Sequence, residues 1–395
     1  MSKRGVTFDS LGQFKNADGE RETIEKVTLT NVNGVEAVVV SYGASLVELR
    51  VPSKDGTVME NLVRGAPSGG GGAKAFADRA TNAFQGATLG PVTGRIPGGE
   101  FELEEGRPVQ IWSNEASGHV LHSGEESFAY QNWSLEPNCA KKHYVKFVHD
   151  MTVGRGAHGG GEEGQVANAG DDHAADADGD NDDDDDDDDD DDEYELPADA
   201  YFAPALDTSI TFQHKTPPNG AWPSEVRALV TYTLTDHDEL VVTHKLLNEG
   251  MRPTPAATST NATFNLGGDG VDAATGVPVR APPSLETHSL RVFANEVLEP
   301  STAGDGTHTG KFLPVDGTLH SWGSRQDDSS GVAVLERSRE ISASQPHWPH
   351  GDCYALDHHE IAAQEREISA ERGREDMAYF CAELRWVASL PLCHT

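Results

Sequence analysis

Cysteine and long apolar runs are scarce in this chain. Its 395 residues include 4 cysteines, at positions 139, 353, 381 and 393, which are too few and too scattered for a disulfide framework, and no Cys-x-x-Cys pair indicates zinc. The pair His358-His359 does not indicate a metal site either, because neighbouring residues on a strand point to opposite faces. No stretch approaches the roughly 18 consecutive apolar residues of a membrane span, and the first residues lack the apolar core of a secretion signal. We therefore expect a cytoplasmic protein with reduced thiols, no metal and no membrane partner.

Basic charge is also scarce. The chain has 30 Lys and Arg against 66 Asp and Glu, which gives a formal net charge of -36. A polyanion of this kind is repelled by nucleic acids and by anionic lipid surfaces. The composition therefore excludes nucleic-acid binding as a function.

Much of the acidic charge lies in one segment. Residues 154–200 form a Gly-rich stretch followed by eleven consecutive aspartates, from Asp182 to Asp192. Because this segment has almost nothing apolar to bury and repels itself, we expect a disordered acidic insertion that interrupts a single domain spanning 1–395. The alternative is that its carboxylates bind cations or a basic partner weakly.

Between the glycines and prolines, apolar residues alternate with period two, which is typical of strands. The clearest alternation runs through 226–234 and resumes at 240–246 after a polar turn, so it predicts a hairpin with one buried face. Helical spacing occurs only at 359–372, and we interpret the Gly-rich residues 69–73 as a loop. Many short strands without helical spacers predict an all-β fold, a large antiparallel β-sandwich.

Four segments carry motifs that follow one another in a telling order. They are 27–56, 86–106 with 121–133, 219–268, and 312–326 with 350–359. The third is the strongest, because it ends in Phe264-Asn265-Leu266-Gly267 after the predicted hairpin. In this order the segments resemble the aldose 1-epimerase (galactose mutarotase) family. The resemblance implies a galactose mutarotase-like supersandwich fold. It also implies an enzyme that interconverts the α and β anomers of a hexose, such as galactose or glucose, without a cofactor.

The resemblance also implies sugar-binding residues. It matches Arg95 and His122 to family positions that contact the ligand, and a guanidinium and an imidazole can both donate hydrogen bonds to a polyhydroxylated sugar. The chain departs from the family at Pro91 and Gly94, where the family has Arg and Asn. Asp352 lies one place after the family's substrate-binding Asp, and a one-residue bulge would bring it into the site.

The catalytic positions of the family fall on Glu383 and Asn261. Glu383, in the segment 380–384, matches the general base that removes the proton from the C1 hydroxyl. Asn261 stands where the family has the histidine that protonates the ring oxygen, and an amide has no proton to transfer near neutral pH. The acid would then be water or His122.

Two functions therefore remain open. One is a functioning aldose 1-epimerase that is slow because it lacks the usual acid. The other is a catalytically impaired homologue that binds a sugar or regulates another process. Substitutions at Gly94, Asn261 and Gly351 fall on functional positions while the neighbouring residues match, which is what loss of catalysis would leave.

Overall fold

The computed structural model describes most of the chain outside its acidic middle. The described residues are 4–53, 56–65, 72–136, 208–216, 222–268, 271–272, 288–290, 292, 294–322, 332–344, 354–356, 379–382 and 385–389. The chain divides into one unit made of 1–141 with 206–395 and a second made of 142–205. The second unit, and with it the insertion predicted at 154–200, lies outside the described residues.

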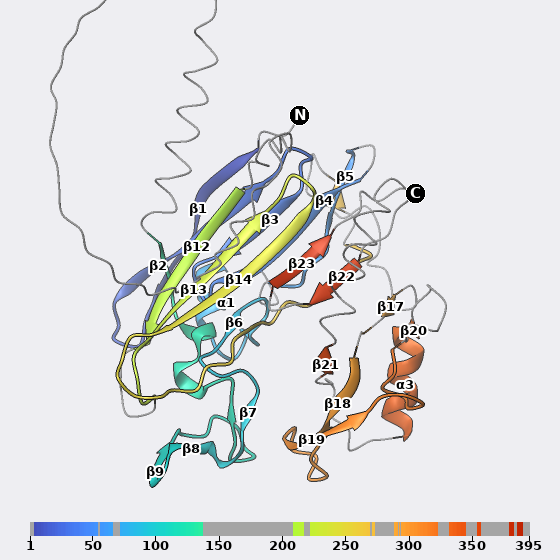
Figure 1. Cartoon of the computed structure of the whole chain (residues 1–395). Coiled ribbons are helices and arrows are strands. Elements are labelled where there is room, and N and C mark those ends of the chain that lie inside the picture. The colour runs from blue at the N-terminus through green and yellow to red at the C-terminus, as the bar shows by residue number, and fades with distance from the viewer. Residues whose placement is uncertain are drawn as a thin grey trace, which may run out of the picture. The chain divides into compact units, whose positions relative to one another are not determined.

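Two six-stranded sheets form the first unit's framework (Figure 1). The first sheet has the order β1 (Gly5–Lys15), β2 (Arg21–Thr30), β3 (Glu36–Val40), β4 (Ser45–Pro52), β5 (Val58–Asn61) and β16 (Val271–Asp272). The second has the order β11 (Ser134–Leu135), β12 (Thr208–Thr216), β13 (Val226–Leu234), β14 (Glu239–Asn248), β23 (Arg385–Ser389) and β22 (Tyr379–Ala382). Neighbouring strands in both sheets run antiparallel.

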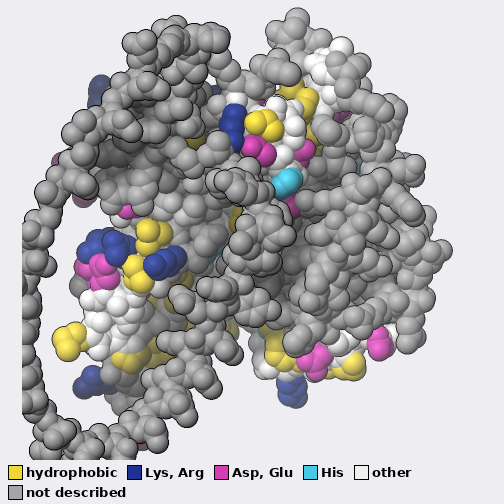
Figure 2. All heavy atoms as spheres, turned by 45° about the horizontal axis from the view of Figure 1, so that its top comes forward, with side chains coloured by type: hydrophobic (Ala, Val, Ile, Leu, Met, Phe, Trp, Pro, Cys, Tyr) yellow, Lys and Arg dark blue, Asp and Glu magenta, His cyan; other side chains and the backbone are white. Residues whose placement is uncertain are grey.

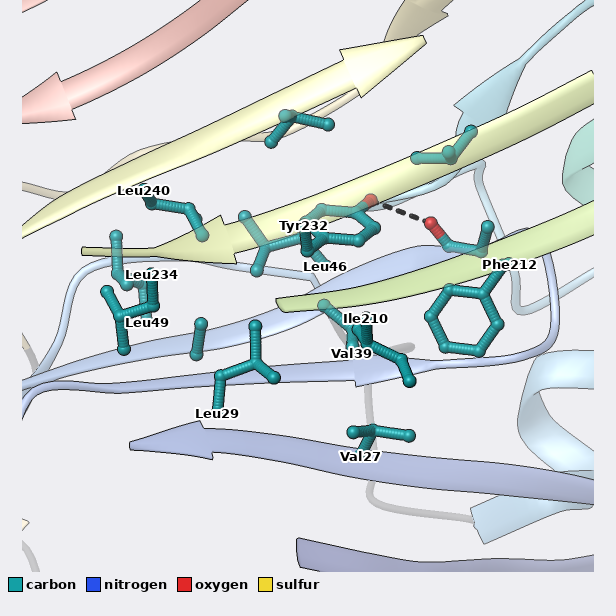
Figure 3. Packing of buried hydrophobic residues seen from close by; sticks show 14 of the residues in the cluster. Val27, Leu29, Val39, Leu46, Leu49, Ile210, Phe212, Tyr232, Leu234 and Leu240 are labelled. Carbon is teal, nitrogen blue, oxygen red and sulfur yellow. Dashed lines mark hydrogen bonds between the residues drawn. The ribbon is translucent and has the colours of Figure 1, made fainter. Parts of the chain in front are cut away.

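The two sheets share one hydrophobic core (Figure 3). Alternation places every second residue of a strand on the inner face, so each sheet contributes a row of apolar side chains. The rows include Val27, Leu29, Val39, Leu46 and Leu49 from the first sheet, and Ile210, Phe212, Tyr232, Leu234 and Leu240 from the second. The buried hydroxyl of Tyr232 donates to the carbonyl oxygen of Ala44 at 2.7 Å, which ties the sheets together. The predicted antiparallel β-sandwich is confirmed.

The predicted hairpin is confirmed as β13 and β14. Their register pairs Leu234 with Leu240 across a turn at 235–238, and Val226, Val230 and Leu234 are buried. One face of the hairpin therefore packs into the core, because the alternation in the sequence matches the pleat.

Two helices among the described residues were not predicted. α1 (Gly72–Ala77) begins inside the segment interpreted as a loop, so that interpretation is wrong from Gly72 onward. α3 (Val334–Ser344) contains the good helix formers Leu, Glu and Arg but few apolar residues, so it has no stripe for periodicity to detect. The helix predicted at 359–372 lies outside the described residues.

Several short elements occur outside the two large sheets. They are β6 (Thr88–Leu89) with β15 (Ser259–Thr260), β7 (Arg95–Ile96) with β10 (Val120–Leu121), β8 (Glu100–Glu104) with β9 (Arg107–Gln110), β17 (Ser289–Leu290) with β20 (Val332–Ala333), a sheet of β18 (Ala294–Pro300), β19 (His308–Pro314) and β21 (Tyr354–Leu356), and the 3-10 turns η1 (Pro97–Gly99), η2 (Gly124–Glu126) and η3 (Phe128–Tyr130).

Charge of both signs is exposed among the described residues. On the face seen in Figure 2, basic side chains lie next to acidic ones.

In the described part of the chain, no helix is both long enough and apolar enough to cross a bilayer.

Candidate functional site

Backbone hydrogen bonds join segments that are far apart in the sequence. The Gly43 amide donates to the Gln131 carbonyl at 2.7 Å, and the Thr88 amide donates to the Gly43 carbonyl at 2.8 Å. The Asn261 amide donates to the Ala87 carbonyl at 2.8 Å. These bonds bring together residues of three of the four motif segments, 27–56, 86–106 with 121–133, and 219–268, which alternation alone does not specify.

His122 lies directly after β10, in a left-handed conformation with φ 50°. Its amide donates to the Gly94 carbonyl at 2.9 Å, and the Gly94 amide donates to its Nδ1 at 3.1 Å. Because Nδ1 accepts this bond, the neutral ring carries its proton on Nε2. The imidazole is therefore held in one orientation with an N–H available on the far side of the ring.

His122 is neutral at physiological pH. Burial lowers its pKa to about 4, and the positive charge of Arg95 acts in the same direction, while Glu115 opposes both. A neutral imidazole can donate a hydrogen bond from Nε2, but it is not a ready source of a transferable proton.

One aromatic ring contacts His122, and a second aromatic ring contacts the first. The Phe84 ring meets the His122 ring edge to face, with centroids 5.0 Å apart, and lies 4.9 Å from the Tyr130 ring. The Arg79 guanidinium covers the Tyr130 ring at 4.5 Å and forms an ion pair with Glu125. Sequence reasoning did not single out these residues. Tyr130 lies inside the segment 121–133 and could have been found there, whereas Phe84 precedes 86–106 and lies in none of the four motif segments.

Asn261 lies beside the same aromatic residue, Phe84. Its Nδ2 donates to the carbonyl oxygen of Phe84 at 2.8 Å, and Phe84 in turn contacts the His122 ring. The structure therefore links these two predicted site residues through a single aromatic residue. The side-chain amide nitrogen of Asn261 is therefore already hydrogen-bonded to a backbone carbonyl oxygen.

Arg95 is near His122 but has other partners. It pairs with Leu121 in the β7–β10 ladder, immediately before His122. Its Nε and Nη2 donate to Glu115 at 2.7 and 2.8 Å, and its Nη1 donates to the carbonyl oxygen of Gly306 at 3.4 Å. All three nitrogens of the guanidinium thus donate hydrogen bonds to other residues of the protein.

Asp352 and Glu383 lie outside the described residues. Asp352 precedes β21 in the sequence, and Glu383 falls between β22 and β23. The pair His358-His359 also lies outside them. Within the described ranges, no three His, Cys, Asp or Glu side chains gather into a group that could hold a metal ion.

Comparison with protein families gives one match that covers most of the chain. The model of the family described as aldose 1-epimerase matches residues 25–156 and 193–358. The matched ranges include Arg95, His122, Asn261 and Asp352 and omit 157–192 and the C-terminal residues that contain Glu383.

Individual relatives are distant. The chain is 30% identical to the maltose epimerase of Levilactobacillus brevis over 133 residues, which is 34% of this chain and 35% of that protein. It is 22% identical to the aldose 1-epimerase of Escherichia coli strain K12 over 315 residues, or 80% of this chain and 65% of that protein. In both cases the chain spans less than two thirds of the relative's length.

A solved structure shares the fold. The galactose 1-epimerase of Lactobacillus acidophilus superposes with a TM-score of 0.51 at 14% identity, covering 85% of this chain and 68% of that one. At this identity the likeness establishes the sandwich architecture alone.

Proposed function

The chain belongs to the aldose 1-epimerase family, and on that basis we propose that it interconverts the α and β anomers of a free hexose such as galactose or glucose. The observation that carries the proposal is the fixed imidazole of His122, with Nδ1 on the Gly94 amide and the Phe84 ring beside it. An oriented N–H donor next to an aromatic face suits a sugar, which presents hydroxyls at its rim and C–H groups on its faces. Two proteins similar to this chain, a maltose epimerase and a galactose 1-epimerase, act on sugars of this class.

The reaction transfers protons and reversibly breaks one C–O bond. A base removes the C1 hydroxyl proton, the bond between C1 and the ring oxygen breaks, and the ring oxygen takes up a proton. The open-chain aldehyde then rotates about the C1–C2 bond and closes on its other face. In this proposal Glu383 is the base, and Asp352 holds a hydroxyl. His122 donates from Nε2 to the sugar and stabilises the negative charge that develops on oxygen.

We expect a slow enzyme. A well-placed side-chain acid or base typically contributes about 10²- to 10⁴-fold in rate. Asn261 supplies no such proton, and the neutral His122 supplies a hydrogen bond instead. Water would then deliver the proton to the ring oxygen.

Polarimetry on freshly dissolved α-galactose and α-glucose tests the proposal with the whole chain. The wild type should shorten the approach to anomeric equilibrium relative to buffer. His122→Asn should abolish most of that acceleration, since an Asn oxygen can still accept from the Gly94 amide but offers no Nε2–H. Acceleration that survives unchanged in His122→Asn would contradict the role given to this residue.

Asn261→His asks whether the site lacks only its acid. An imidazole Nδ1 can occupy the position of the Asn Nδ2 and donate to the Phe84 carbonyl, and the protonated ring then carries a second N–H on Nε2, which faces outward and can act as the acid. We expect the rate to rise by about 10²-fold or more. Asn261→Gln is the matched control, because it adds bulk without adding a titratable group.

A second candidate function is sugar binding without catalysis. The observation that favours it is the use of the Asn261 amide to hold Phe84, which makes this position structural. Sugar-dependent NMR shifts at Phe84 and Tyr130 without faster mutarotation would support this function. An absence of both binding and acceleration would contradict both functions.

We also propose that 154–200 is an acidic insertion within one domain. The gap at 157–192 in the family match supports this boundary. Replacing 154–200 by a short Gly-Ser linker should leave the near-UV circular dichroism and the mutarotation rate unchanged. A loss of folding would contradict the proposal.

A further inference from the structure

The tip of the β18–β19 hairpin is bound to the β7–β10 loops. The tip comprises residues 301–307 and is closed by a 2.8 Å hydrogen bond from the Ser301 amide to the Thr307 carbonyl. Two of its neighbouring residues, Asp305 and Gly306, each contact a side chain about two hundred positions earlier in the chain. Contacts over such a separation are specified by the tertiary fold.

The first contact is made by Arg95 with a glycine. The Nη1 of Arg95 lies 3.4 Å from the carbonyl oxygen of Gly306. Gly306 has φ 75°, and a Cβ atom there would lie 2.5 Å from Nη1 and 2.8 Å from Cζ of Arg95. A side chain at position 306 would therefore have to displace the guanidinium, and the positive φ also favours glycine there.

Glu115 fixes the direction of this guanidinium. Its two carboxylate oxygens accept from Nε and Nη2 of Arg95 at 2.7 and 2.8 Å, a bidentate pair. Their side chains are 30% and 20% exposed, so the pair is partly shielded from water. The geometry leaves Nη1 pointing at Gly306.

The second contact is made by His119. Its Nδ1 accepts from the Gly98 amide at 3.1 Å, so its Nε2 carries the proton and donates to Asp305 Oδ2 at 3.1 Å. The other oxygen of Asp305 accepts from the amide and hydroxyl of Thr307 at 3.0 and 2.6 Å. These bonds hold the pKa of the Asp305 carboxyl well below its usual range. The tip is therefore fixed at two adjacent residues.

We propose that Arg95 is a positioning residue, which together with Glu115 holds the tip 301–307 beside the strand leading to His122. The proposal rests on the proposed function. It follows from the ladder partner of Arg95, which is Leu121, the residue before His122. Release of the tip would loosen the strand that orients the imidazole.

Glu115→Gln separates this role from direct sugar binding. If Arg95 acts by holding the tip, Glu115→Gln and Arg95→Lys should both lower kcat/KM by roughly tenfold, because each loses charge-assisted hydrogen bonds. Most of that loss should be in kcat, because the loosened imidazole stabilises the developing charge less well. If Arg95 acts only by binding the sugar, Glu115→Gln frees the guanidinium and leaves kcat and KM unchanged or KM lower, while Arg95→Lys raises KM. That second pattern overturns the proposal.

Hydrogen exchange at 301–307 tests the same role without any activity. Arg95→Lys, Glu115→Gln and Gly306→Ala should each speed amide exchange in the tip by roughly tenfold or more. Arg227→Lys is the matched control, because Arg227 pairs with Glu249 on the second sheet, and it should leave the tip unchanged. Unchanged tip exchange in Arg95→Lys overturns the proposal.

The titration of His122, followed by NMR, adds a readout that loss of structure alone would not produce. Arg95→Gln should raise the pKa of His122, whereas Glu115→Gln should lower it, because their charges act on the ring in opposite directions. Shifts of the same sign would contradict the proposed arrangement. If the wild type shows no mutarotation, the proposed function fails, while tip exchange still decides whether Arg95 holds the tip.

Discussion

The Nδ2 of Asn261 donates a 2.8 Å hydrogen bond to the carbonyl oxygen of Phe84, a residue 177 positions earlier in the chain. Asn261 stands where the family resemblance expects a catalytic histidine. Its backbone also donates to Ala87 and accepts from Gly86, so one residue holds the loop 84–87 by three hydrogen bonds. At the position where the resemblance expects a catalytic residue, the asparagine thus holds a neighbouring loop in place.

Asn261→Asp should destabilise the protein more than Asn261→Ala. Alanine removes one hydrogen bond, with a cost of about 1 kcal/mol. Aspartate keeps the shape but directs a carboxylate at the Phe84 carbonyl, and this repulsion adds to the loss. Urea unfolding at neutral pH measures both free energies of unfolding. Equal stability of the two variants would show that the Asn261 amide does not hold Phe84.

Tyr232→Phe should lower the free energy of unfolding by about 1 to 2 kcal/mol. The hydroxyl donates to the buried Ala44 carbonyl at 2.7 Å, between the two sheets. Thr231→Val is the control, since Thr231 is on the opposite face of β13 and bonds a half-buried hydroxyl of Thr211 at 2.8 Å. We expect this control to change the urea midpoint by less than half as much, and a larger effect in the control would contradict the inter-sheet role.

Gly86→Ala should be far more damaging than Gly94→Ala. Both glycines have positive φ, 70° and 88°. A Cβ at Gly86 would collide with the Leu46 backbone carbonyl, whereas one at Gly94 meets nothing within 4 Å. We expect a cost of about 1 kcal/mol at Gly94 from the backbone conformation and at least about 3 kcal/mol at Gly86 from the added collision. Thermal unfolding of the two variants checks the difference, and similar melting temperatures would refute it.

Stability should fall as the pH is lowered from about 6.5 towards 4. His122, His214 and His244 each have a pKa lowered to about 4, chiefly by burial. In the unfolded chain each has a pKa near 6.5, so the unfolded state binds more protons in this interval and is favoured by acid. The free energy of unfolding that these three neutral histidines contribute is fully present above about pH 6.5. It falls as the pH is lowered to about 4 and does not change further below that pH. Urea midpoints across this interval measure the effect.

His214→Phe should reduce that pH dependence. The His214 ring packs against Phe128 and Trp133, with centroids 5.7 and 5.5 Å apart, so a phenyl ring suits the same surroundings. The variant removes one of the three buried titrating groups while keeping the packing. An unchanged slope of stability against pH, or an NMR titration of His214 near its ordinary pKa, would contradict this account.

The predictable part of the fold came from local repetition. Alternating residues such as Val226, Val230 and Leu234 commit a segment to a strand with one apolar face, and that face must be buried against another layer. α3 was not predicted because it has few apolar residues, so the sequence shows no clear helical periodicity there. α1 was missed because it begins within a run of glycines.

The candidate site was only partly predictable. Arg95, His122 and Asn261 were found because they lie in motifs, but nothing local indicates that Arg95 is bound to Glu115 and Gly306. Phe84 was missed because its role comes from the side chains that meet it in space.

The amino-acid sequence by itself determined the sandwich, the hairpin of β13 and β14, and the family, since these depend on periodicity and on the order of motifs along the chain. The tertiary structure alone decided which donors remain available to a ligand. A hydrogen bond uses up a donor only when folding brings its acceptor within about 3 Å, and that proximity is a property of segments far apart in the sequence.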